Sequence, residues 1–145
     1  MKKLTLLFVS LFLITACGGE PGFTLVEDGD RAQGDINDVY SGSAVVSGHY
    51  TYAPEATLFN FTFFLDDDSK DLVPNDNLSN GNFFFLNEDS NAMLGLEDED
   101  LEACASYTGE ATVLIEGYNS NLVEGAAMDS TVLLEVIENS GPVCE

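Results

Sequence analysis

The chain has 145 residues, of which 26 are acidic and only four are lysine or arginine, so its formal net charge at pH 7 is −22. Nucleic acids and anionic lipid head groups bind proteins through clustered Lys and Arg, which this chain lacks. Nucleic-acid binding is therefore excluded, and the expected partners are cations or basic surfaces, such as a basic protein.

An apolar segment follows two lysines at the amino terminus. Lys2 and Lys3 precede a predominantly apolar run from Leu4 to Ala16. A run of about thirteen residues has the length of the apolar region of a secretory signal and is too short to cross a bilayer. Residues 1–16 are therefore predicted to be an export signal.

A cysteine ends this segment. Ile14, Thr15, Ala16 and Cys17 form the series branched apolar, small, small, cysteine, which closely resembles the lipobox of bacterial lipoproteins. The resemblance covers residues 1–18 and implies cleavage before Cys17, a diacylglyceryl group on its sulfur and acylation of the new amino terminus. Several acyl chains give a stable anchor, whereas one chain binds only marginally. The alternative is an ordinary secretory signal that contains a cysteine.

The residue after the cysteine bears on the destination. In such lipoproteins an Asp at this position is associated with retention in the inner membrane, and Gly18 stands here instead. The resemblance therefore implies an outer-membrane lipoprotein, anchored by lipid and facing either the periplasm or the cell exterior.

The remaining cysteines are Cys104 and Cys144, 40 positions apart. Disulfides persist in the compartments that exported proteins occupy, so we predict that these two residues pair. The alternative is two reduced thiols. A zinc site is disfavoured, because two cysteines and the one histidine, His49, supply too few ligands.

The composition changes after the signal. Residues 17–37 are rich in Gly, Asp and Glu and are predicted to be an acidic tether, although the apolar stretch 23–26 is also compatible with an added edge strand. Once the signal is removed, two basic and 26 acidic residues remain, a net charge of −24.

Residues 38–145 are predicted to form one all-β domain. Ala44, Val46, Tyr50 and Tyr52 alternate with mostly polar residues, the period of a half-buried strand. Similar short segments occur in 56–68, 82–88, 91–97, 103–118 and 130–138, separated by Gly, Asn, Asp and Pro. The pattern favours an antiparallel β-sandwich of immunoglobulin-like architecture, with a small β-barrel as the alternative. A single helical turn is plausible only in 97–105.

No catalytic motif is recognisable. His49 falls on the polar face of its strand, where we expect an exposed imidazole without a catalytic role. The chain has no nucleophile elbow, zinc-protease motif or phosphate-binding loop. We therefore predict that the protein is not an enzyme. A hydrolase that uses two carboxylates requires only a spatial pair and stays an alternative.

Two acidic runs supply oxygen atoms of the kind that calcium prefers. Neither run matches the EF-hand pattern. Two interpretations stay open: loops that keep the protein soluble through surface carboxylates, or at least one site for Ca²⁺. The candidate ligands are Asp66, Asp67, Asp68, Asp71 and Asp76 in the first run, and Glu97, Asp98 and Asp100 in the second.

These observations predict a non-catalytic lipoprotein of the outer membrane with an acidic β-domain that serves as a binding or interaction module, stabilised by calcium if a site exists. A second hypothesis is an inhibitor or scavenger of cationic proteins, in which the acidic face attracts a basic target.

Overall fold

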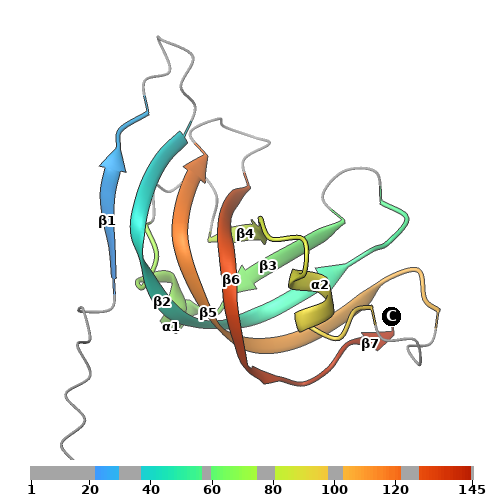
Figure 1. Cartoon of the computed structure of the whole chain (residues 1–145). Helices are drawn as coiled ribbons and strands as arrows, with labels where there is room; N and C mark the ends of the chain where they lie inside the picture. Colours follow the sequence, from blue (N-terminus) through green and yellow to red (C-terminus); the bar gives the residue numbers. More distant parts are fainter. Residues whose placement is uncertain are drawn as a thin grey trace, which may run out of the picture.

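The computed structural model describes residues 22–29, 37–56, 60–74, 81–97, 103–121 and 128–144 (Figure 1). Within these ranges the chain forms seven strands and two one-turn helices, which confirms the predicted all-β class. The helices lie in 67–70 and 90–93, so the predictions of a strand in 91–97 and of a helical turn only in 97–105 were wrong. No helix in the described ranges is long and apolar enough to span a membrane. The elements are β1 (Gly22–Glu27), β2 (Asn37–Tyr52), β3 (Phe61–Leu65), α1 (Asp67–Lys70), β4 (Asn82–Phe85), α2 (Ser90–Met93), β5 (Tyr107–Asn121), β6 (Asp129–Asn139) and β7 (Val143–Cys144).

The two longest strands, β2 and β5, pair antiparallel along their whole lengths, from Asn37 opposite Asn121 to Tyr52 opposite Tyr107. The predicted alternation holds in β2, where Ala44, Val46, Gly48 and Tyr50 are buried, whereas Val45, Ser47 and His49 are more exposed. Both strands curve strongly as they cross the molecule (Figure 1). This pair therefore forms the main wall of the fold.

The sheet closes on itself. Its strand order is β1-β2-β3-β4-β6-β5-β7, and the additional pairing of β2 with β5 completes a ring of β2, β3, β4, β6 and β5. Of the two predicted arrangements, this is the small barrel rather than two separate sheets. One neighbouring pair also differs from the antiparallel expectation: β4 and β6 are parallel, with Phe83 opposite Asp129 and Phe85 opposite Thr131.

The topology of this ring is distinctive. If β2, β3, β4, β5 and β6 are numbered 1 to 5 in chain order, their order around the ring is 1-2-3-5-4, and strand 4 closes the ring on strand 1. Strands 3 and 5, which are β4 and β6, are parallel. The short helix α2 lies in the chain between strands 3 and 4, which are β4 and β5. This arrangement is a closed five-stranded barrel with one parallel pair. Folds of this kind carry many functions, so the topology alone assigns none.

The barrel interior is filled mainly by aromatic side chains. Phe63 and Phe83 are fully buried and stack with ring centroids 5.1 Å apart, and Phe85 and Phe61 pack beside them at 5.3 Å from each other. Such rings bury large apolar areas and dominate core energetics. Leu94, from the turn after α2, is also fully buried; the amide nitrogen of Asn139 donates to its carbonyl oxygen at 3.0 Å, which fastens this turn to the end of β6.

The parallel junction continues past the end of β4 through one side chain. The backbone N–H of Leu86 donates to the carbonyl of Thr131 at 2.9 Å. The Asn87 amide then bonds both backbone groups of Leu133, accepting from its N–H at 2.9 Å and donating to its carbonyl at 3.2 Å. The side chain of Asn87 thus replaces the next residue of the strand pair.

Both ends of the sheet are attached to the barrel. β1 pairs antiparallel with β2, and Phe23 packs on Tyr118 with ring centroids 5.6 Å apart, so residues 22–27 are an edge strand rather than part of a free tether. At the other end, β7 pairs with β5, and Cys144 forms the predicted disulfide with Cys104, with a Cα–Cα distance of 5.8 Å.

Candidate functional site: an acidic groove across three strands

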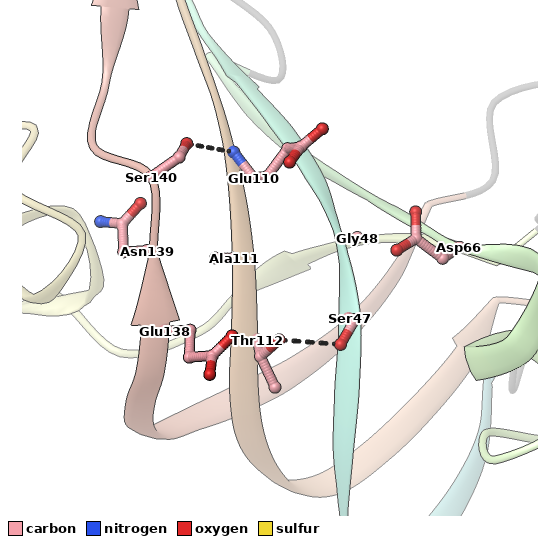
Figure 2. A pocket seen from close by; sticks show the side chains of 9 residues that line it. All are labelled: Ser47, Gly48, Asp66, Glu110, Ala111, Thr112, Glu138, Asn139 and Ser140. Atoms are coloured by element: carbon pink, nitrogen blue, oxygen red, sulfur yellow. Dashed lines mark hydrogen bonds between the residues drawn. The ribbon is translucent and has the colours of Figure 1, made fainter.

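A groove of about 380 Å³ crosses the outer surface of β2, β5 and β6 (Figure 2). We call it the acidic groove because three carboxylates line it, one from each of three separate elements. Asp66 follows β3, Glu110 belongs to β5 and Glu138 to β6. The full lining is Ser47, Gly48, Asp66, Glu110, Ala111, Thr112, Glu138, Asn139 and Ser140.

Strand register brings these residues together. Ser47 lies opposite Thr112, which in turn lies opposite Glu138. In the next row Gly48 faces Ala111, two positions with little or no side chain. Side chains on one face of a sheet meet across strands in this way, so the groove consists of adjacent rows of the barrel wall.

Hydrogen bonds fix the walls of the groove. The hydroxyls of Ser47 and Thr112 lie 2.8 Å apart and join β2 to β5. The backbone N–H of Glu110 donates to the Ser140 hydroxyl at 2.9 Å, and the N–H of Ser140 donates to the Glu110 carbonyl at 2.9 Å. Figure 2 shows both side-chain bonds, with the carboxylates of Asp66, Glu110 and Glu138 separate from them. The backbone is therefore held in place while the acidic groups stay exposed.

Positive charge is scarce around the groove. In the described part of the chain Lys70 is the single lysine or arginine, and it donates to Asp67 at 2.7 Å. The hydrogen bond from Lys70 and its charge lower the pKa of Asp67. His49 lies opposite Glu110 in the β2–β5 register and stacks on Phe64, with ring centroids 4.8 Å apart. It is exposed, as the alternation predicted.

The predicted calcium ligands that the structure describes do not gather at one point. Asp66 lines the acidic groove, Asp67 pairs with Lys70, and Asp68 and Asp71 are exposed on α1 and just after it. Glu97 is exposed after α2, and Asp76, Asp98 and Asp100 lie outside the described residues. Across the described ranges, no three or more His, Cys, Asp or Glu side chains are placed to hold a metal ion. Calcium binding stays a prediction, as does lipidation, since Cys17 also lies outside these ranges.

Glu110 and Glu138 did not emerge as candidates from the sequence. They are single acidic residues within strands, whereas the acidic runs drew attention to loops. The available signal was the alternation of β5, which places Glu110 on the outer face. The exposure of β6 does not alternate around Glu138, so the local pattern offered no such signal for that residue. The pairing that makes them neighbours joins residues far apart in the chain and is not visible in a local pattern.

Two further cavities lie elsewhere on the barrel. The apolar cavity, about 580 Å³, is lined by Gly22, Phe23, Tyr40, Ala44, Val45, Asp71, Leu72, Val73 and Pro74. The aromatic cavity, about 400 Å³, is lined by Asn60, Phe61, Phe84, Phe85, Leu86, Asn87, Glu88, Ser90 and Asn91. Volumes of this size are typical of ligand sites.

Comparison of the chain with protein-family models, with curated proteins and with solved structures gives no significant match.

Proposed function

We propose that the protein is a non-catalytic lipoprotein of the outer membrane, anchored through Cys17, whose acidic groove binds a basic segment of another protein. The observation that carries the binding role is that Asp66, Glu110 and Glu138 all line one groove and that no basic residue is among its lining. Anchoring rests on the resemblance of residues 14–17 to a lipobox.

Electrostatics supports a cationic partner. Carboxylates that lie within a Debye length of about 8 Å of a bound ligand act on it together. The net charge of −24 on the mature chain adds a long-range attraction that accelerates encounter with a basic protein. The Ser47 and Thr112 hydroxyls and the Asn139 amide supply neutral hydrogen-bonding partners between the charges.

Two charge-matched double variants test the groove. E110Q/E138Q removes two groove carboxylates, and E116Q/E135Q removes two exposed carboxylates on the same strands outside the groove. Fluorescence anisotropy with a lysine-rich peptide is expected to show about tenfold weaker binding for the first variant and about twofold or less for the second. Equal weakening would mean that only net charge attracts the peptide.

Anchoring has a separate test. Cells that express the protein and its C17A variant are grown with an alkyne-labelled fatty acid, and the label is detected on the purified chain. The expected result is label on the native protein, found with the outer-membrane fraction, and none on C17A. An unlabelled native protein would remove the anchor and leave the groove hypothesis standing.

The alternative of an inhibitor or scavenger uses the same groove with a lytic or other basic enzyme as the target. An inhibitor must block the active site of the enzyme, whereas a binding module leaves it free. Turnover of a basic enzyme such as a lysozyme, measured with and without the protein at low and at physiological salt, separates the two. Inhibition that E110Q/E138Q abolishes would favour this alternative.

A carboxylate-pair hydrolase has less support. Its acid must keep a proton near neutral pH, and burial in apolar surroundings is what raises a carboxyl pKa that far. Asp66, Glu110 and Glu138 are all exposed. Solvated carboxylates suit the attraction of a cation better than general-acid catalysis.

The aromatic cavity favours a second candidate function, the binding of a saccharide. The support is an analogy of architecture: OB-folds, which are also small five-stranded barrels, bind oligonucleotides and oligosaccharides on the face of their second and third strands. The second and third strands of the barrel here are β3 and β4, and the charge of the chain argues against oligonucleotides. Phe84 and the half-exposed Leu86 offer apolar surface, and Asn60 and Asn91 offer amides. A screen of glycans with the native protein and the F84A variant tests saccharide binding. The V45A variant is the control for the loss of an exposed apolar side chain. Equal signals from both variants would count against it.

A further inference from the structure

Strand β1 lies at one end of the strand order and pairs only with β2 among the described strands. Among the labelled elements, Figure 1 shows none beyond the outer edge of β1. Side chains on both of its faces are solvent-accessible, with Leu25 45% and Val26 56% exposed. Edge strands are commonly protected by lysine, proline or a covering element, and residues 22–27 have no lysine or proline.

The register shows which backbone groups face the open side. Ser47 accepts from the Asp66 N–H at 3.0 Å, and its own N–H donates to the Ser69 hydroxyl, so its backbone points to the edge of β2 that β1 and β3 share. Backbone direction alternates along a strand, so Ser43 points to the same edge and forms a hydrogen-bonded pair with Gly22. It follows that Phe23 and Leu25 direct their N–H and C=O groups away from β2.

The apolar cavity lies at the Gly22 end of this strand. Gly22 and Phe23 form one side of it, and Val45 and Leu72, 46% and 48% exposed, form the rim. A strand that pairs with the open edge of β1 and continues past Gly22 reaches this cavity. Strand addition combines backbone bonds, which give affinity, with pockets for individual side chains, which give specificity.

The negative charge around the open edge of β1 indicates which kind of partner can bind there. Glu27 is the last residue of β1, Asp28 follows it, and Asp71 lies at the cavity. A second copy of the chain would bring like charges together at this edge. We propose that the open edge of β1 accepts, by strand addition, an extended segment of a partner in which basic residues alternate with apolar ones, one apolar side chain entering the apolar cavity. This deepens the proposed function, on whose basic partner it rests.

Proline at residue 25 provides a sharp test, because it removes an outward N–H while leaving the β1–β2 hydrogen bonds intact. The full lipoprotein in detergent, labelled with ¹⁵N, is titrated with a short peptide of alternating lysine and valine. Shifts are expected at residues 22–26, Val45 and Leu72. L25P should bind about tenfold more weakly, and L25T about as well as the native chain. If L25P does not fold, L25K serves as the second test. It keeps the backbone donor but adds a charge that repels the basic peptide, so it should also weaken binding.

The outcomes separate this site from the acidic groove. If the E110Q/E138Q variant still binds the peptide and the L25P variant does not, the result supports strand addition, even if the groove binds nothing. Shifts confined to Asp66, Glu110 and Glu138 would overturn the strand proposal and leave the proposed function intact. Equal affinities of L25P and L25T would also overturn it, as would concentration-dependent self-association through β1 in place of peptide binding.

Discussion

Replacement of Gly109 by alanine should destabilise the barrel, although a methyl group in place of a strand glycine normally stabilises by roughly 0.5–1 kcal/mol. A Cβ at residue 109 would lie 2.3 Å from the Tyr50 hydroxyl and 2.4 Å from its Cζ. Tyr50 is fully buried, and its hydroxyl donates to the Asn139 amide oxygen at 3.3 Å, so the ring has no free space to enter.

The size of the effect follows from two contributions. Overpacking a filled core costs about 1–3 kcal/mol, and displacing the ring also breaks its hydrogen bond, at about 1 kcal/mol. We expect the free energy of unfolding of G109A to be roughly 3 kcal/mol lower than that of the native chain, and its melting midpoint roughly 10 °C lower.

Urea and thermal melts followed by circular dichroism measure these changes, with T108A as the control on the neighbouring residue. The double variant G109A/Y50L should lose less stability than the sum of the losses of its two single variants, because a leucine at residue 50 leaves room for the alanine methyl group. Additive losses, or a G109A variant as stable as the native chain, would refute the steric argument.

Three further predictions concern the ends of the barrel. Replacement of Cys104 and Cys144 by serine should lower the free energy of unfolding by about 4 kcal/mol in the chain-entropy model, measured by urea melts against the oxidised native protein; unchanged stability would show that the bridge constrains little. N87A leaves both backbone groups of Leu133 without their partner and should cost about 2 kcal/mol, whereas N91A, on α2, should cost less than half of that; similar losses would contradict the strand-replacing role. Burial raises the pKa of Tyr50 above 10.0, so its contribution to stability is present below about pH 10 and is lost as the pH rises through the folded-state value. Y50F has no phenol to ionise and should therefore lose less stability than the native protein between pH 8 and 11. Parallel losses in the two proteins would argue against the assignment of this pH dependence to Tyr50.

The sequence was most informative where the periodicity was regular. The alternation around Ala44, Val46 and Tyr50 predicted both a strand and its buried face, and the count of cysteines predicted the bridge. These features depend on local pattern and on composition. The edge strand at residues 22–27 was left as an alternative, because six residues without a visible partner do not distinguish a strand from a tether.

Closure of the barrel could not be predicted in the same way. It depends on the parallel contact between β4 and β6, whose residues are more than 40 positions apart, and on the pairing of β2 with β3 along one edge and with β5 along the other. Short apolar strands such as 82–85 fit a sandwich or a barrel equally well. The acidic groove is a product of the same long-range register. Two of its carboxylates, Glu110 and Glu138, are single acidic residues within strands, and they join Asp66 in one groove only when β5 and β6 pair.

The pairing of β2 with β5 also has a consequence for biogenesis. A ribosome or export channel releases β2 long before β5, so the sixteen-residue strand first enters solution without its main partner. Nascent strands in that position are prone to join one another, and folds rich in such distant contacts form slowly. The dense negative charge of the chain keeps neighbouring copies apart during this interval, so the acidity that we assign to recognition also protects the newly made polypeptide from aggregation.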